Sequence, residues 1–218
     1  MSTELVTILA VAVVALAGAA WGVAADRLAA RWPQHEPDTP HRGVDWRTAF
    51  VAIVSAVAFA ALVMRFSDPR DVLLLGVYSA ALVVLLATDL DQKLLPDALT
   101  LPLIVLTALM LAVDWSPLLA GTPNALLNGV AAGIGAPVIL FLLDILLKGA
   151  LGAGDLKLSV SIGLLVGISR FFTGFVIASA ASSFVLLALI AARRIGLRTA
   201  IPFGPVLICA AFLAMLLP

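Results

Sequence analysis

Apolar segments close to the length of a bilayer span recur along almost the whole 218-residue chain. A helix needs about 20 apolar residues to cross a hydrocarbon core about 30 Å thick. The segments are continuously apolar, whereas the strands of a membrane-spanning barrel alternate between apolar and polar residues. The sequence therefore predicts an all-α fold, a polytopic integral membrane bundle.

Eight segments approach the required length, and the sixth of them is short. They cover residues 5–25, 46–64, 72–88, 99–113, 125–147, 158–168, 172–192 and 200–217. The first has no basic residue before its apolar stretch and is long for a cleaved signal peptide, so we expect it to be retained. We expect about eight transmembrane helices in one membrane-embedded domain over residues 1–218, with 26–45 as a cytoplasmic loop.

The composition agrees with a membrane protein. Hydrophobic residues make up 63% of the chain and charged residues 12%, against about 45–50% and about 25% in soluble domains. Thirteen basic and thirteen acidic residues cancel, which gives no reason to expect nucleic acid as a partner. Cys209 is the single cysteine, so the chain has neither an intramolecular disulfide nor a cysteine cluster for zinc.

The distribution of lysine and arginine predicts the orientation. With the N-terminus outside, ten of the 13 basic residues fall in cytoplasmic loops, and only Arg65, Arg70 and Arg170 lie outside. Short cytoplasmic loops carry this excess in membrane proteins. The same orientation puts Asp89 and Asp155 on the cytoplasmic side, where the cluster 193–198 would meet anionic lipid.

The first group of polar residues that could carry chemistry is the run 89–97, directly after the third apolar segment. Ionisable groups at a membrane boundary are costly to desolvate and often mark function. Charge content alone favours a solvated loop, in which Asp91 and Lys93 screen each other, Pro96 starts the next helix and Asp97 lies in its first turn. Asp89 is the exception, because it directly follows the apolar segment.

The second group is Gly152-Ala153-Gly154-Asp155, between the fifth and sixth apolar segments. Glycines adopt backbone conformations closed to other residues and let another chain approach, so this motif could present Asp155 to an extended peptide. The alternative is a flexible turn in which Asp155 caps the sixth helix. Lys157 either holds a substrate or orients Asp155, or it extends its ammonium group to the membrane surface.

Together the two groups predict an aspartyl protease. Two carboxyl groups held close together do not both ionise easily, so one keeps a proton. The ionised group can then take a proton from water, which attacks the scissile carbonyl, while the other donates to the carbonyl oxygen. This chemistry needs no metal or other cofactor.

The sequence resembles the type IV prepilin leader peptidases, which are relatives of the intramembrane Gly-x-Gly-Asp proteases. The resemblance covers about residues 80–218 and is carried by three motifs in the same order, 89–103, 152–158 and 201–205. It implies that Asp89 and Asp155 are catalytic and that prepilins or pseudopilins are cleaved after a glycine, at the cytoplasmic face of a bacterial inner membrane. The supporting or substrate-binding residues would be Gly152, Gly154, Lys157, Pro96 and Asp97.

One feature departs from the family. Many bacterial members carry paired Cys-x-x-Cys motifs between their first two spans and also methylate the new N-terminus using S-adenosylmethionine. The corresponding loop here has no cysteine, so zinc binding is not expected and methyltransferase activity is not supported. Its two histidines, His35 and His41, lie among prolines, which favours a solvated surface over metal ligands.

Two other features have mainly structural interpretations. Asp144 lies four residues before Lys148 in the fifth segment, which favours a helical ion pair over a proton relay. Gly129, Gly133 and Gly135, with two alanines, Ala132 and Ala136, predict close packing of helices.

Two other functions remain open at this stage. In a transporter or channel, Asp89, Asp144 and Asp155 would line a cation path, although the chain lacks the character of an inverted repeat. In a noncatalytic membrane scaffold, the aspartates would be dispensable.

Overall fold

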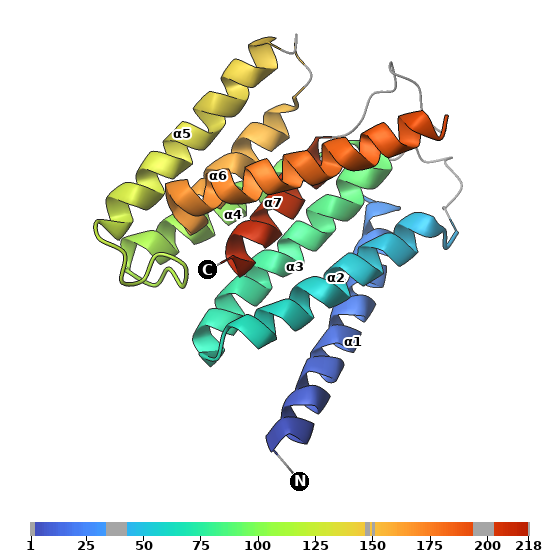
Figure 1. Ribbon diagram of the computed structural model, residues 1–218, viewed down its shortest axis with the longest axis horizontal. Helices are drawn as coiled ribbons and strands as arrows, with labels where there is room; N and C mark the ends of the chain where they lie inside the picture. The colour runs from blue at the N-terminus through green and yellow to red at the C-terminus, as the bar shows by residue number, and fades with distance from the viewer. Residues whose placement is uncertain (1–2, 34–42, 147–148, 150, 194–202, 218) are drawn as a thin grey trace. The chain divides into compact units, whose positions relative to one another are not determined.

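The computed structural model describes residues 3–33, 43–146, 149, 151–193 and 203–217, and within them it contains helices and no strand (Figure 1). The helices are α1 (Thr3–Ala29), α2 (Trp46–Arg65), α3 (Pro69–Gln92), α4 (Asp97–Ala112), α5 (Ala125–Leu146), α6 (Ala153–Ala191) and α7 (Gly204–Leu216). The predicted all-α fold is confirmed.

Five of these helices are long and apolar enough to cross a membrane: α1, α2, α3, α5 and α6. The other two, α4 and α7, have 16 and 13 residues, which gives lengths of about 24 and about 20 Å at the helical rise of about 1.5 Å per residue. Each of the eight predicted spans overlaps one of the seven helices. The polytopic helical bundle expected from the sequence is therefore the fold of this chain.

The sixth and seventh predicted spans lie in one helix, α6, which is interrupted at Gly167. This residue has φ 74° and ψ 179°, a left-handed conformation that favours glycine. Figure 1 shows the chain changing direction within α6. The sequence correctly predicted two helical segments here, but a single residue separates them where a short loop was expected.

Side chains satisfy the backbone groups that this interruption leaves without helical partners. Asn128 Oδ1 accepts a hydrogen bond from the Ile168 N–H (3.0 Å), and Ser116 Oγ donates to the Leu165 carbonyl oxygen (3.4 Å). A β-carbon at position 167 would lie 3.1 Å from Asn128 Cγ. Because unpaired backbone groups are costly in a bilayer, Asn128 and Ser116 make the sharp turn possible.

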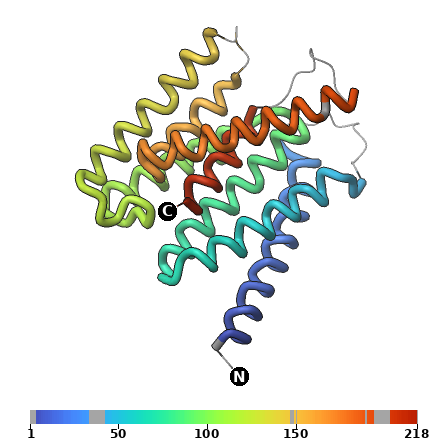
Figure 2. The backbone as a smooth tube through the Cα atoms, in the orientation of Figure 1, coloured from blue at the N-terminus to red at the C-terminus, as the bar shows by residue number. Residues whose placement is uncertain are grey.

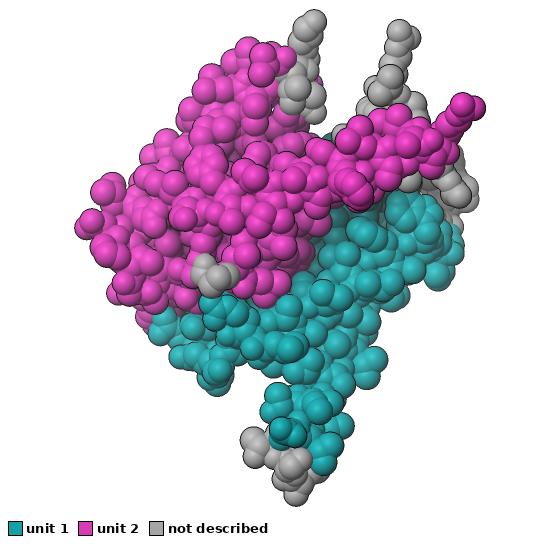
Figure 3. Space-filling model, in the orientation of Figure 1, with its two compact units in different colours: residues 1–99 teal, residues 100–218 magenta. Residues whose placement is uncertain are grey.

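The first of two compact units comprises residues 1–99 (Figure 3). Helices α1, α2 and α3 each pack against the other two. A β-carbon on Gly22 would lie only 2.6 Å from Ala52 Cα, so this glycine allows the backbones of α1 and α2 to meet. Hydrogen bonds join the end of α1 to the start of α2 (Arg27 to Thr48) and to the end of α3 (Gln92 to Ala29), so consecutive helices alternate in direction.

The second unit comprises residues 100–218, and α6 packs against both α5 and α7 in it (Figure 2). Gly163, before the interruption, meets α5: its β-carbon would lie 2.5 Å from the Ala132 carbonyl oxygen. Gly174, after the interruption, meets α7 and would place a β-carbon 2.5 Å from the Ala210 carbonyl oxygen. The two segments of α6 thus have different partners. The prediction of one domain over residues 1–218 stays a prediction.

The predicted small-residue stripe of α5 is confirmed for four of its five members. Gly129, Gly133, Ala132 and Ala136 are buried, and a β-carbon on Gly133 would lie 2.7 Å from Leu164 Cγ. Gly135 is different, because a β-carbon there would meet nothing within 4 Å. It lies off the face that packs against α6.

Gly163→Ala should therefore destabilise the second unit, because its methyl group would overlap the backbone of α5. We expect a loss of about 1–3 kcal/mol, the usual cost of overpacking, visible as a lower Tm of purified protein in detergent. Gly135→Ala is the matched control, and alanine in a helix is favoured over glycine by about 0.5–1 kcal/mol. Equal Tm values for the two variants would contradict the close α5–α6 contact.

Candidate active site

Asp89 lies in the last turn of α3. The helix continues through Gln92, and Lys93 ends it with φ 55°, its N–H donating to the Asp89 carbonyl oxygen (2.9 Å). The sequence had suggested a loop directly after Thr88, so the helix is one turn longer than expected. Thr88 is fully buried and Asp89 is only 5% exposed. The Asp89 carboxyl group is therefore held on a regular helix inside the protein.

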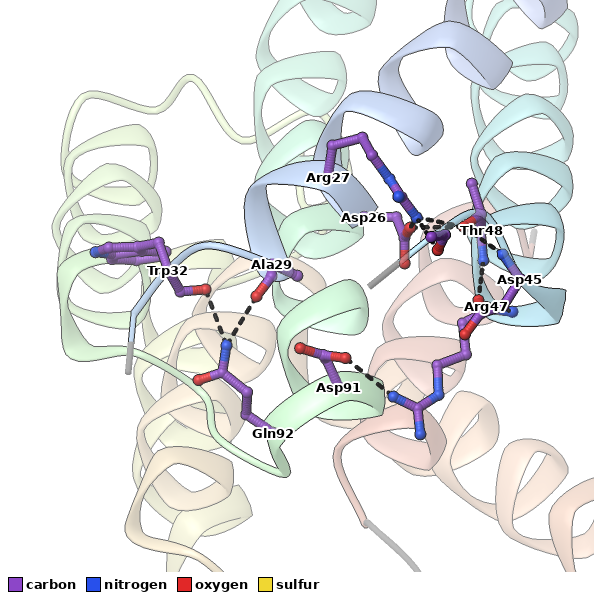
Figure 4. Close-up of polar contacts among 10 residues, drawn as sticks. Asp26, Arg27, Ala29, Trp32, Asp45, Arg47, Thr48, Asp91 and Gln92 are labelled. Atoms are coloured by element: carbon purple, nitrogen blue, oxygen red, sulfur yellow. Dashed lines mark hydrogen bonds and ion pairs between the residues drawn. The ribbon is translucent and has the colours of Figure 1, made fainter. Parts of the chain in front are cut away.

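Two polar residues that follow Asp89 on the last turn of α3, Asp91 and Gln92, hold the end of this helix in place (Figure 4). Asp91 Oδ1 forms an ion pair with Arg47 Nη1 at the start of α2 (3.0 Å). Gln92 Nε2 donates to the carbonyl oxygen of Ala29, the last residue of α1 (2.8 Å), and to that of Trp32, which follows the helix (3.1 Å). The sequence suggested Lys93 as the partner of Asp91, whereas this ion pair joins residues 44 positions apart. These contacts fix α3 just beyond the Asp89 side chain.

A buried carboxyl group that the sequence analysis did not single out, Asp26, belongs to the same region. It is 1% exposed, and its Oδ2 accepts from Thr48 Oγ1 (2.7 Å) and pairs with Arg27. The expected loop 26–45 therefore begins inside α1, which extends to Ala29. Nothing in the sequence indicated that Asp26 is buried, because this residue is the first of the polar stretch that follows the apolar run.

The start of α2 has a signature that is readable in the sequence. Asp45 Oδ1 accepts from the N–H groups of Arg47 (2.9 Å) and Thr48 (3.3 Å), and the Asp45 N–H donates to Thr48 Oγ1 (3.3 Å). This is a capping box, in which the side chains at the first and fourth positions satisfy each other's backbone. Thr48 thus connects the cap of α2 to buried Asp26.

Two predicted supporting residues lie where α4 begins. Asp97 is its first residue and is exposed, as expected for an acid in a first turn. Pro96 precedes the helix, and its carbonyl oxygen accepts from the Leu99 N–H (3.0 Å). The predicted start of this helix is confirmed within one residue.

Asp155 occupies the third position of α6, directly after the Gly-x-Gly motif. Its Oδ2 accepts from the N–H of Gly152, the N-cap residue (3.0 Å). The side chain is 7% exposed, and its Oδ1 is buried with no hydrogen-bond partner in the part of the chain that the structure describes. The carboxyl group is thus fixed through one oxygen, while the other stays available.

We had expected the glycines of this motif to adopt a backbone conformation closed to other residues, and this expectation is wrong for both of them. Gly152 has φ −82° and ψ 152°, which any residue adopts, and Gly154 lies inside the helix. Gly152 and Ala153 are exposed. The other expectation for this motif, that its small residues leave room for an extended peptide next to Asp155, stays a prediction. Lys157, one turn from the motif, is half-buried.

Asp144, near the end of α5, contacts the segment before Asp155. Its Oδ1 accepts from the Leu151 N–H (2.7 Å), and its carbonyl oxygen accepts from the Gly149 N–H (2.9 Å). Its predicted partner Lys148 lies outside the described residues, as do His35, His41, Arg194 and Arg198.

Among the described residues, the buried carboxyl groups are Asp26, Asp89 and Asp155. Asp26 is neutralised by Arg27. The other two belong to different units, residues 1–99 and 100–218, and lie at helix ends that carry the two sequence motifs. Each of the two motifs thus places one buried carboxyl group at a helix end.

Comparison with known proteins points the same way. A chain from Bacillus subtilis (strain 168), described as a prepilin leader peptidase/N-methyltransferase, is 27% identical over 168 residues, which cover 75% of this chain and 63% of the relative. Relatives with the same description from Pseudomonas putida and Aeromonas hydrophila are 28% and 29% identical, each over 78% of this chain and 58% of the relative. The chain thus spans about three fifths of the length of these relatives. No solved structure matches.

The family comparison covers both motifs. The sequence profile of the type IV leader peptidase family matches residues 76–217, which include Asp89 and Asp155 and make up well over half of the chain. This chain therefore belongs to the type IV leader peptidase family.

Proposed function

We propose that this protein is a membrane aspartyl endopeptidase that removes the short basic leader of type IV prepilin-like proteins. The observation that carries the proposal is the burial of two carboxyl groups, Asp89 and Asp155, within the stretch that the family profile matches. Buried carboxyl groups are rare in membrane helices because their desolvation is costly, and those that persist usually serve a function. The names of the matched relatives support leader cleavage.

The proposed chemistry uses the two carboxyl groups as one acid–base pair. The ionised group takes a proton from a water molecule, and the resulting hydroxide attacks the scissile carbonyl carbon. The protonated group donates its proton to the carbonyl oxygen. When the tetrahedral intermediate collapses, the C–N bond breaks and a proton passes to the leaving amine.

The environment of Asp155 suits this role. The Gly152 N–H binds Oδ2, so Oδ1, which is buried and accepts no hydrogen bond from the described residues, would be the oxygen that exchanges the proton. The exposed backbone at Gly152 and Ala153 leaves room for an extended peptide next to the carboxyl group. The ion pair of Asp91 with Arg47 and the Gln92 bonds would keep Asp89 in register on α3.

We further propose that both carboxyl groups act at the cytoplasmic face of a bacterial inner membrane. In the first unit, the end of α3 lies with the end of α1 and the start of α2, which carry Arg27 and Arg47 from the predicted cytoplasmic loop. In the second unit, the end of α5 lies with the start of α6. A crossing by α4, whose sequence joins the two, would bring Asp89 and Asp155 to the same side.

The proposed substrate is a prepilin or pseudopilin whose basic leader stays in the cytoplasm while its apolar helix lies in the bilayer. Cleavage would follow the glycine that precedes this helix. The proposal covers leader cleavage alone: the segment 26–45 contains no cysteine, and cleavage by two carboxyl groups needs no cofactor.

A cation transporter or channel is less well supported. Such a path would use Asp144 together with Asp89 and Asp155. One oxygen of the Asp144 carboxylate instead accepts a hydrogen bond from the Leu151 N–H in the loop between α5 and α6.

Replacing either proposed catalytic aspartate by asparagine should abolish cleavage and leave membrane insertion intact, since asparagine keeps the size but cannot titrate. Asp89→Asn, Asp155→Asn and the double variant should be equally inactive, because groups that share one step are not additive. Cleavage of purified prepilin in detergent measures this. Asp97→Ala should retain activity, and Asp91→Ala should retain it with lower stability because Arg47 loses its partner. A folded Asp155→Asn protein that cleaves at the parental rate would contradict the mechanism.

Mass spectrometry of a prepilin co-expressed with the enzyme should show a product that begins directly after the glycine preceding its apolar helix. The same prepilin co-expressed with the Asp89→Asn variant should keep its leader. A leader that is retained in the presence of the folded parental protein would count against the proposed substrate class.

Cysteine accessibility should show that the segment between α3 and α4 faces the cytoplasm. In a Cys209→Ser background, Leu95→Cys should react with an impermeant thiol reagent only after the inner membrane is permeabilised. Asp114→Cys, at the other end of α4, should react in intact spheroplasts. Labelling of position 95 in intact spheroplasts would overturn the proposed orientation.

A further inference from the structure

The loop before Asp155 is held between two carboxylates. Asp144 Oδ1, on α5, accepts from the N–H of Leu151 at 2.7 Å, and Asp155 Oδ2, on α6, accepts from the next N–H, that of Gly152, at 3.0 Å. Consecutive backbone amides thus bind two different carboxyl groups. Asp144 lies outside the Gly-x-Gly-Asp motif that contains Asp155.

The Asp144 contact is well suited to fix the position of this loop. Asp144 is half-buried on a regular helix, and a hydrogen bond from an N–H to a carboxylate is shorter and stronger than one between neutral groups. The Asp144 carbonyl oxygen also accepts from the N–H of Gly149 (2.9 Å), whose φ of 81° turns the chain back. The residue therefore binds the loop through both its backbone and its side chain.

Movement of Leu151 would move the donor that holds Asp155. The two N–H groups belong to adjacent planar peptide units that share the Leu151 α-carbon, so a displacement of Leu151 displaces the Gly152 amide as well. Since the Gly152 N–H donates the hydrogen bond that holds Asp155 Oδ2, the Oδ1 atom would then change its direction. Small displacements of a reacting group have large effects on rate.

We propose that Asp144 is a positioning residue that orients the Asp155 carboxyl group through the Leu151–Gly152 backbone. This inference rests on the proposed function, in which Asp155 is catalytic. The role differs from an ion pair with Lys148 and from a proton relay, because it requires an acceptor oxygen at one place and requires no charge or proton transfer.

Three variants of Asp144 separate geometry from charge. Asp144→Asn removes the charge but keeps the Oδ1 acceptor in place. Asp144→Glu keeps the charge but moves the carboxylate outward by one methylene group. Asp144→Ala removes the acceptor. The readouts are kcat and KM for prepilin cleavage, the Tm in detergent, and hydrogen exchange of the peptide containing Leu151.

The positioning role predicts a loss confined to kcat. Asp144→Ala and Asp144→Glu should lower kcat about ten- to a hundredfold, with KM changed by less than about twofold, because binding of the substrate is not affected. Asp144→Asn should restore kcat and the slow exchange of the Leu151 peptide. A relay or an ion pair predicts the opposite order, with the glutamate variant active and the asparagine variant impaired.

Asp71→Ala is the matched control, because it removes a carboxylate from the first turn of α3, at the other end of that helix from Asp89. It should leave kcat unchanged. A folded Asp144→Ala protein with the parental kcat would overturn the proposal. Should that variant fail to fold, a parental kcat in Asp144→Glu would overturn it equally.

Asp155→Asn, measured in the same series, distinguishes a failure of the positioning role of Asp144 from a failure of the proposed peptidase function. An inactive Asp155→Asn protein together with a fully active Asp144→Ala protein would remove only the positioning role. An active Asp155→Asn protein would remove the proposed function itself.

Discussion

The cost of burying a carboxyl group among apolar helices governs how the polar residues of this protein are arranged. A carboxylate taken out of water needs opposite charge or hydrogen-bond donors nearby. Asp26 meets this need through Arg27 and Thr48, and the same cluster caps α2 through Asp45. Asp155 receives a single described donor, the Gly152 N–H. Its second oxygen, Oδ1, is the atom that the proposed mechanism uses.

Glycines determine how closely the helices around these groups can pack. Gly22 brings α1 and α2 together, and Gly163 brings the first segment of α6 against α5. Apolar attraction is weak between helices in lipid, so such close approach is a main source of association there. At Gly167 the role is different, because the backbone itself requires φ 74°. The first segment of α6 is thus joined to α5 at two places, by packing at Gly163 and, just before the helix begins, by the hydrogen bond from the Leu151 N–H to Asp144.

Much of this fold was predictable from sequence, because length and continuous apolarity predict membrane helices almost independently of tertiary structure. The start of α4 at Asp97 followed from local preferences of the same kind. The extension of α3 through Gln92 did not, since polar residues after an apolar run suggest a loop unless distant partners stabilise them. Arg47, 44 residues from Asp91, supplies such a partner. The hydrogen bond of Asp144 to the Leu151 N–H was hidden for the same reason, because it depends on how the loop folds back, while helical spacing pointed to Lys148.

The proposed mechanism requires the carboxyl groups of Asp89 and Asp155 to act together on one peptide bond. Chemical cross-linking tests this requirement: the Asp89→Cys, Asp155→Cys protein, in a Cys209→Ser background, is treated with a short bifunctional thiol reagent. The chain is then cleaved between the two cysteines, between α5 and α6 for this pair and between α2 and α3 for the control pair. A cysteine pair at positions 47 and 91, whose native side chains lie 3.0 Å apart, serves as the positive control. The proposed mechanism predicts that the 89–155 pair cross-links as efficiently as the control pair. Efficient cross-linking of the control with none between 89 and 155 would contradict a shared site.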